Sequence, residues 1–514
     1  MTFLGPLAAV TLTHVLEKAG VIVDALLVAA VLSLPAQRLG ARARSLAMAA
    51  ALLLTPVLLA AALWNSGKVA TLHHHPLEGV AAVVGAVLIV AALAHLFHKR
   101  PMLFPLLAIA ALPFRIPLGK ISNGLLIPLY VVMAAALVDH MVRTWRQGAE
   151  EPGEDGRESG RPQLLEYTLS AYVLLYAIQA TYTTDFTKAL EQVGFFYVPF
   201  ALLFSLLRTV RWDRELVRRC LWVIASLAVL FVLVGFGEFL RHHLLLNPTL
   251  DSDAYFVRIN SLFYDPNIFG RFLALTMIVL AAAMLFDSRR RHVLAAAGAL
   301  AVMWVGLLLS GSQSSIAALL VGLAVVGAGY WGGRVAAGVA VLAAAVVLVV
   351  ALLGGASLHV DLSNSSSANA ETSGRYSLVT EGVDRFADRP LYGYGSGSFA
   401  REYCLHAPCG PTTTRDSHTT PVTVAAEQGV IGLAVYLALL AACLGRLFGG
   451  ALLGGVERPG GLARLAVAAA FAGLVVHTLL YADFLEDPIS WVLLAVGTAL
   501  AWAAAERGGA TSAT

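Results

Sequence analysis

The feature that most constrains this chain is a series of long apolar runs that recurs from one end of its 514 residues to the other. Hydrophobic residues make up 58% of the chain and charged residues only 13%. One soluble core cannot bury so much apolar surface, and a helix of about 20 mostly apolar residues is what crosses a bilayer. The sequence therefore predicts an all-α polytopic membrane protein with about 12–15 transmembrane helices.

The expected spans follow the apolar runs. They cover residues 20–35, 45–64, 77–97, 101–118, 122–141, 164–182, 193–209, 217–240, 266–286, 293–310, 313–330, 335–356, 419–445, 465–482 and 488–505.

Basic residues gather in alternate loops, for example at residues 208–219 and 289–291. By the positive-inside rule these loops are cytoplasmic. The loops at 241–265, 357–418 and 482–488 are then expected to be extracytoplasmic.

These observations divide the chain into six parts. They are N-terminal transmembrane helices at 1–146, a flexible Gly/Glu-rich cytoplasmic linker at 147–163, central transmembrane helices at 164–356, an extracytoplasmic loop at 357–418, C-terminal transmembrane helices at 419–505 and a cytoplasmic tail at 506–514.

The loop at 357–418 is longer than a connector needs, which is typical of a functional loop or a disordered one. Apolar residues at three- and four-residue steps predict a short helix within it that lies on the membrane surface; they are Tyr376, Val379, Val383 and Phe386. Cys404 and Cys409 lie five residues apart in the same loop, and we expect them to form a disulfide if the loop is extracytoplasmic. Two free thiols are the alternative.

Three arginines lie on the expected extracytoplasmic side, where arginine is uncommon: Arg115 in "LPFRIPLGK", Arg258 in "RINSLFYDPNIFG" and Arg375 in "SGRYSLV". A guanidinium presents a planar fork that matches two phosphate oxygens. Converging arginines would therefore hold a diphosphate without a metal ion. The alternative for each is a local carboxylate or a lipid phosphate.

The stretch "RDSHTTPVTVAAEQGVIG" places His418 where a hydrophilic run turns into an apolar one. An imidazole titrates near pH 6.5, so it can accept a hydroxyl proton at neutral pH, and Asp416 or another carboxylate could orient it. A packed or capping histidine is the alternative. For Glu427 the favoured interpretation is a buried glutamate bonded to a neighbouring span.

Several classes of function find no support in the residues. No metal-ligand spacing or nucleotide-binding loop occurs, so neither a metal nor another cofactor is expected. The loop at 357–418 carries five arginines against seven acidic residues. Diffuse binding of a polyanion is therefore disfavoured, and no nucleic-acid partner is expected.

Three stretches together resemble the O-antigen ligase and polymerase superfamily. "HTTPVTVAAEQGVIG" has the family's histidine followed at fixed spacing by Gly429 and Gly432, although Thr419 departs from the usual second residue. "RINSLFYDPNIFG" and "GRYSLVTEGVDRFADRPLYGYGSGSF" are similar to its two arginine motifs. In "LSGSQSSIAAL", Gln313 stands where the family often has arginine.

The resemblance implies a metal-independent, inverting glycosyltransferase of the GT-C type in a bacterial cytoplasmic membrane, with its active site on the extracytoplasmic side. Such enzymes move a glycan from an undecaprenyl-diphosphate carrier to a hydroxyl of a lipid, glycan or protein acceptor. His418 would act as base or orient the acceptor, and Arg258 and Arg375 would bind the diphosphate, with Arg115 as a weaker addition.

Three functions remain open from the sequence. A ligase attaches a finished glycan to an acceptor, whereas a polymerase of the same fold extends the glycan itself. A polysaccharide or lipid transporter would use the arginines as a substrate gate, but it predicts inverted repeats and charges near the membrane midplane, and neither is evident.

Overall fold

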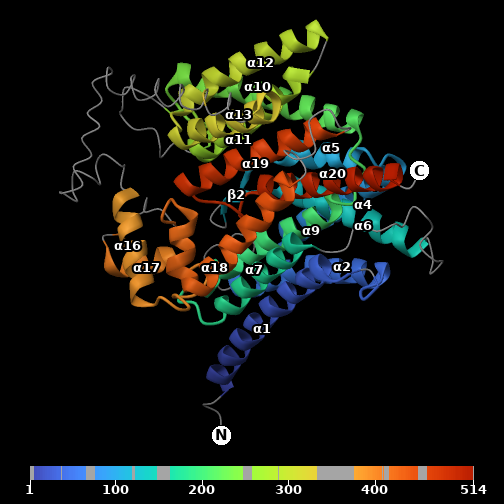
Figure 1. The fold of residues 1–514 in the computed structure, drawn as a ribbon. Coiled ribbons are helices and arrows are strands. Elements are labelled where there is room, and N and C mark those ends of the chain that lie inside the picture. The colour runs from blue at the N-terminus through green and yellow to red at the C-terminus, as the bar shows by residue number, and fades with distance from the viewer. Residues whose placement is uncertain are drawn as a thin grey trace.

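The structure is a computed structural model that describes residues 5–35, 37–64, 76–118, 122–146, 163–246, 258–286, 289–332, 338, 375–407, 409, 416–449 and 460–512. Within these ranges the protein is a bundle of helices, with one short pair of strands (Figure 1).

The N-terminal elements are α1 (Gly5–Ser33), α2 (Ala41–Leu63), α4 (Pro76–Lys99), α5 (Leu103–Ala111), β1 (Ile116–Leu118), β2 (Ser122–Leu125) and α6 (Ile127–Arg146). The central elements are α7 (Leu164–Ala180), α8 (Phe186–Gln192), the π-helical turn η3 (Val193–Tyr197), α9 (Val198–Leu207), α10 (Arg214–Arg241), α11 (Pro266–Phe286), α12 (Arg290–Ser310) and α13 (Gln313–Trp331). The C-terminal elements are α16 (Arg375–Asp388), α17 (Phe399–His406), α18 (Thr420–Phe448), α19 (Gly461–Leu480) and α20 (Pro488–Ser512).

Ten of the described helices are long and apolar enough to cross a membrane. They are α2, α4, α6, the continuous unit from α8 to α9, α10, α11, α12, α13, α18 and α19. Two shorter apolar helices, Leu164–Ala180 and Pro488–Ala503, add to these ten. The prediction of a polytopic all-α membrane protein is therefore confirmed. All but residue 338 of the span expected at 335–356, and all but residue 163 of the linker expected at 147–163, lie outside the described residues.

The span expected at 101–118 is wrong. Helix α5 has only nine residues, so it rises about 14 Å, less than half the thickness of the hydrocarbon core. The chain then forms β1, which pairs with β2 in an antiparallel sheet. Pro113 and Pro117 follow α5 closely, and proline cannot continue a helix because it lacks the amide hydrogen and clashes with the preceding turn. Hydropathy alone does not register this interruption.

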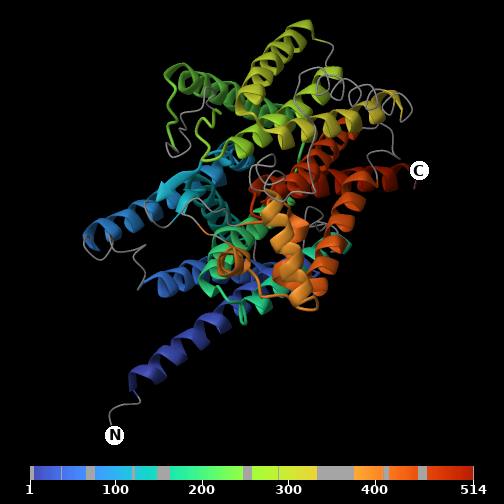
Figure 2. The same cartoon turned by 90° about the vertical axis from the view of Figure 1, so that its left-hand side faces the viewer.

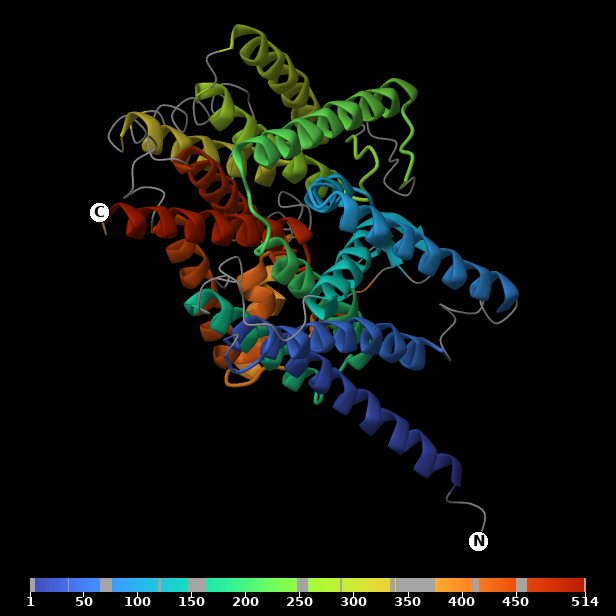
Figure 3. The same ribbon diagram turned by 90° about the vertical axis from the view of Figure 1, so that its right-hand side faces the viewer.

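The C-terminal helices connect two groups of helices. Helix α19 packs against α11 and α13 of the group that also contains α10 and α12. Helix α18 packs against α7, and α20 against α9, in the group that contains α1 and α2. Figure 3 shows α10 and α12 on one side of α20, with α1 and α2 on the other.

Helices α16 and α17 stand together beside α18 at one side of the bundle (Figures 1 and 2). The predicted helix after Arg375 is confirmed, but its buried residues are Leu378 and Gly382, which face α18, whereas Val383 is exposed. Cys404 and Cys409 form the expected disulfide, with a Cα–Cα distance of 5.1 Å. The loop therefore contains packed helices and a covalent bridge.

Helix α18 is interrupted at Gly429, whose φ of 65° and ψ of −165° lie outside the helical region. Such a break removes the helical partners of nearby backbone groups. The turn that follows α16 replaces some of these partners. The Val430 amide donates to the Pro390 carbonyl at 2.7 Å, and the Ile431 amide donates to the Leu391 carbonyl at 3.4 Å.

The same turn also pairs with carbonyls that precede the break. The Tyr394 amide donates to the Ala426 carbonyl at 3.4 Å, and the Gly395 amide donates to the Glu427 carbonyl at 2.8 Å. The two backbones approach so closely that a Cβ on Gly393 would lie 2.2 Å from the Glu427 carbonyl oxygen. The glycines of "YGYGSGSF" thus allow the turn to dock on the interrupted helix.

The Glu427 side chain fixes the end of this turn. Its Oε2 accepts from the Gly397 amide at 2.8 Å, and its Oε1 accepts from the Phe399 amide at 3.0 Å. The Phe399 amide begins α17, so the carboxylate caps that helix. Glu427 is buried and bonded, as expected, but its partner is this turn and not a neighbouring span.

We predict that Gly429→Ala destabilises the protein, because its backbone conformation is almost confined to glycine and a Cβ would lie 2.5 Å from the Leu391 backbone. The strain alone costs on the order of 1–3 kcal/mol. Gly445→Ala is the matched control: it lies on the same helix with no atom within 4 Å of an added Cβ. Thermal unfolding in detergent should show a lower midpoint only for Gly429→Ala. Equal midpoints for the two variants would refute the prediction.

Candidate active site

Four segments that are distant in the sequence meet at one end of the bundle. They are the stretch before α11 with Arg258, the start of α16 with Arg375, the stretch before α18 with His418, and residues 481–487 between α19 and α20. Electrostatic interactions link His418 to Arg375, Asp265 and Asp483. They also link Arg258 to Arg375 and Asp265. The structure therefore brings His418, Arg258 and Arg375 together.

His418 is held in an unusual backbone conformation with a φ of 58°, which is uncommon for residues other than glycine. The buried Ser417 next to it fixes the local chain. Its Oγ donates to the Thr419 carbonyl at 2.8 Å and also lies 2.8 Å from the Thr423 hydroxyl. The imidazole lies beside the Tyr481 ring, with 5.2 Å between centroids. The turn and the aromatic contact together set the direction of the imidazole.

The environment favours a neutral His418. Burial, followed by the positive charge of Arg375, lowers the pKa of His418 from its ordinary value of 6.5, and Asp265 and Asp483 partly offset this effect. Its Nδ1 is buried and has no hydrogen-bond partner among the described residues. Asp265 and Asp483 thus act on His418, which fits the expectation that Asp416 or another carboxylate would do so.

Tyr481 connects the imidazole to Asp265. Its hydroxyl donates to Asp265 Oδ2 at 2.9 Å. Burial, followed by the charge of Asp265, raises the pKa of Tyr481 well above 10. The phenol therefore stays protonated and remains a hydrogen-bond donor at neutral pH.

Arg258 is anchored on two helices. Its Nε donates to the Ser310 carbonyl at the end of α12 at 2.9 Å, and its Nη2 donates to Asn267 Oδ1 at 3.0 Å. These bonds fix the plane of the guanidinium, and its Nη1 has no hydrogen bond within the described part of the chain. Burial, followed by the opposing effects of Asp265 and Arg375, lowers the pKa of Arg258.

The backbone next to Arg258 is fixed by Glu238, a buried residue near the end of α10. Its Oε2 accepts from the amides of Asn260 and Ser261 at 3.2 and 2.7 Å. The Ile259 amide donates to the Leu309 carbonyl at 3.2 Å. Arg258 therefore starts from a rigid segment even though its own side chain is exposed.

Arg375 is the first residue of α16 and is half-buried. The start of a helix carries a partial positive charge. Arg258 and Arg375 act on each other, and like charges repel, so an anion bound near both would be stabilised.

Arg115 lies elsewhere. Its charge acts on Tyr130 of α6, and no contact among the described residues joins it to His418, Arg258 or Arg375. Its Nε is buried without a hydrogen-bond partner within those residues.

The segment at 481–487 is held by Arg271, which is fully buried on α11. Its Nη1 donates to the carbonyls of Ala482 and Asp483 at 3.3 and 3.2 Å, and its Nη2 pairs with the Asp487 carboxylate. Asp483, Tyr481 and Asp265 did not stand out as site residues in the sequence. The "YDPN" and "ADFLEDP" stretches were the available signals, because both place acids beside a helix-starting proline on the same expected side.

No group of three or more histidine, cysteine, aspartate or glutamate side chains is arranged to hold a metal ion among the described residues. What the site contains is an imidazole that the charge of Arg375 favours in its neutral form, and a second guanidinium, Arg258, that interacts with Arg375. This arrangement can hold an anionic leaving group and accept a proton next to it.

Residues 298–437 match the family model described as O-antigen ligase. The matched segment includes Arg375 and His418, whereas Arg258 precedes it. The match supports the O-antigen ligase and polymerase superfamily that the sequence motifs indicate. No curated protein matches the chain.

The pH dependence of His418 gives a direct check of these contacts. A base must be neutral to accept a proton. Because the pKa of His418 lies below 6.5, the active form is present above pH 6.5, and it is lost as the pH falls through the lowered pKa. Arg375→Gln removes a cation and should raise the pKa, whereas Asp265→Asn removes an anion and should lower it. Histidine-labelled NMR titrations, with His418→Ala to assign the signal, will measure both shifts. Shifts of the same sign in the two variants would disprove the assignment.

Proposed function

We propose that this protein is an extracytoplasmic glycan ligase. It transfers a glycan from a polyprenyl-diphosphate carrier of the undecaprenyl type to an acceptor hydroxyl. The observation that carries the proposal is the convergence of His418, Arg258 and Arg375 from three separate segments, with the imidazole kept neutral. A base beside two phosphate-binding groups is what this reaction requires.

The roles follow from the chemistry of each group. The acceptor hydroxyl gives its proton to the His418 imidazole as its oxygen attacks the anomeric carbon of the donor. The bond between that carbon and the diphosphate oxygen breaks, and the electron pair leaves with the polyprenyl diphosphate. Attack from the face opposite the leaving group inverts the configuration.

Arg258 and Arg375 stabilise the departing diphosphate, whose negative charge grows as the bond breaks. Two guanidiniums supply the positive charge that a divalent cation supplies in other enzymes, so we propose a metal-independent reaction. Asp265 and Asp483 limit the fall in the pKa of His418, and Tyr481 packs against its ring. Arg115 is not included in this diphosphate clamp.

Two observations support an extracytoplasmic site. Helix α12 runs from the basic residues at 289–291 to Ser310, whose carbonyl holds Arg258. Its 21 residues span about 31 Å, which is long enough to separate the site from the basic cluster by the thickness of a membrane. The positive-inside rule favours the basic end as the cytoplasmic one. The disulfide between Cys404 and Cys409 suits an oxidising compartment on the other side.

We expect His418→Ala to reduce transfer by about 100- to 10,000-fold, since that is the usual effect of losing a general base. Donor binding should persist because both arginines remain. The assay uses purified protein, a polyprenyl-diphosphate-linked glycan and a panel of hydroxyl acceptors, followed by mass spectrometry.

Near-normal turnover by His418→Ala would exclude the catalytic role. With wild-type protein, the product separates the remaining functions. Sugar joined to a foreign acceptor indicates a ligase, sugar joined to a second donor glycan indicates a polymerase, and movement of the donor across a vesicle membrane without a new bond indicates a transporter.

Lysine substitutions test the clamp. Arg258→Lys and Arg375→Lys keep the charge but lose the two-pronged contact with phosphate, so each should weaken binding of the lipid diphosphate. Arg401→Lys is the control, since Arg401 lies on exposed α17 and bonds the Thr184 carbonyl. Binding can be followed by the quenching of intrinsic fluorescence with a labelled polyprenyl diphosphate. Normal binding by both lysine variants would place the diphosphate elsewhere.

A further inference from the structure

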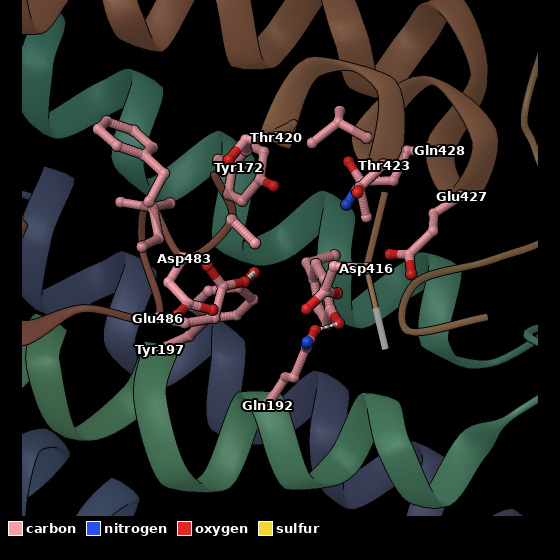
Figure 4. A pocket seen from close by; sticks show the side chains of 15 residues that line it. Tyr172, Gln192, Tyr197, Asp416, Thr420, Thr423, Glu427, Gln428, Asp483 and Glu486 are labelled. Carbon is pink, nitrogen blue, oxygen red and sulfur yellow. Dashed lines mark hydrogen bonds between the residues drawn. The ribbon is translucent and has the colours of Figure 1, made fainter. Parts of the chain in front are cut away.

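A small cavity of about 40 Å³ is lined in part by Asp483, one of the two carboxylates that act on His418 (Figure 4). Glu486 and Tyr197 lie beside Asp483, and Asp416 lies across the cavity from them. A single buried water needs roughly 10–15 Å³ of such space. The cavity therefore admits a few groups of the size of a hydroxyl, and not a whole glycan.

The walls of this cavity are held in place by hydrogen bonds. The Tyr197 hydroxyl donates to Glu486 Oε1 at 2.6 Å. The Tyr176 hydroxyl donates to Gln192 Oε1. Figure 4 shows Gln192 reaching toward the cavity from its helix, with Asp416 and Glu427 on the facing side. The cavity is thus lined by groups that can both donate and accept hydrogen bonds.

One wall residue is buried with an unused polar atom. Gln428 is only 1% exposed and lines the cavity. Its side chain is hydrogen-bonded to Tyr172, another wall residue, yet its Oε1 has no hydrogen-bond partner among the described residues. Leaving such an atom unpaired costs about 1–3 kcal/mol, so a ligand that donates a hydrogen bond would be favoured there.

The Gln428 side chain is also set in place. Its backbone carbonyl accepts from Gln179 Nε2 at 3.2 Å, and Gly429, the next residue, is the break in α18. A Cβ on Gly432 would lie 2.0 Å from the Gln428 side chain, so the glycine leaves room for it. The spacing of His418, Gly429 and Gly432 therefore also places this amide.

Charge indicates what the cavity accepts. Asp416, Asp483 and Glu486 line it, whereas Arg258 and Arg375 do not. Burial, followed by the charge of Asp483, raises the pKa of Glu486 to about 7, so this carboxyl both donates and accepts hydrogen bonds near neutral pH. Carboxylates repel a diphosphate or another anion, but they bind sugar hydroxyls well.

We propose that this cavity binds the hydroxyl edge of the acceptor, as a neutral sugar, with Gln428 Oε1 accepting a hydrogen bond from one of its hydroxyls. The assignment rests on the proposed function, because it places the acceptor in a cavity that is lined by Asp483, which acts on His418, and not by the two arginines proposed to bind the donor. Gln428 is a positioning and recognition residue, and the proton still moves to His418.

The experiment measures binding without turnover. Wild-type protein in lipid nanodiscs is mixed with methyl β-D-glucopyranoside, and saturation-transfer NMR reports contact with the sugar. The matched probe is the corresponding glucuronide, which has the same ring with a carboxylate. We expect saturation of the neutral glycoside and at least about tenfold weaker binding of the anionic one.

Two leucine variants locate the binding. Gln428→Leu should weaken binding of the neutral glycoside about three- to tenfold, the usual loss for one hydrogen bond. Gln163→Leu is the control, because Gln163 precedes α7, bonds Arg446 and does not line the cavity. Unchanged binding in Gln428→Leu, equal loss in both variants, or equal binding of both glycosides would overturn the proposal.

Transfer assays separate this proposal from the broader one. If wild-type protein transfers glycan and Gln428→Leu does so with an unchanged acceptor KM, the cavity assignment alone is wrong. If the neutral glycoside binds in a Gln428-dependent way but no donor glycan is ever transferred, the proposed function is wrong and the sugar-binding cavity stands.

Discussion

The geometry of this site depends on the break in α18 at Gly429. A continuous helix would satisfy its own backbone, and the turn after α16 would have nothing to dock on. Because the helix is broken, that turn pairs with amides and carbonyls on both sides of the break, and the Glu427 carboxylate caps the start of α17. The break at Gly429 thus fixes the segment that carries Arg375 against α18, the helix that begins just after His418.

Groups of both charges act at the site. Arg258 and Arg375 repel each other, and Asp265 offsets part of that repulsion at Arg258. Asp265 and Asp483 also offset part of the effect that Arg375 has on His418. Asp416, Asp483 and Glu486 line a small cavity, and the two arginines do not. A base that has both cations and carboxylates as neighbours suits a reaction whose two substrates differ in charge.

The sequence predicted the membrane class, most of the spans and the three residues that converge, because apolar length, the positive-inside rule and short motifs each leave a local signal. Asp265, Tyr481 and Asp483 were missed because an acid or tyrosine at a helix end has no distinctive spacing. The failed span at 101–118 has a different cause: hydropathy sums composition, whereas Pro113 and Pro117 act through geometry. Glu427 was correctly interpreted as buried and bonded, but its partner depends on a backbone break that no residue pattern specifies.

The site lies where two structural units join. His418 and Arg375 belong to a unit formed by α16, α17 and α18, which the turn at 390–395 ties together. Arg258 belongs to a second unit, in which α10, α11 and α12 hold it through Glu238, Asn267 and the Ser310 carbonyl. Tyr481 at the end of α19 bonds Asp265 and stacks beside His418, so it connects both units. A diphosphate held by Arg258 and Arg375 would bridge the same junction. Its binding energy would then hold the leaving group and the His418 base in fixed positions relative to each other.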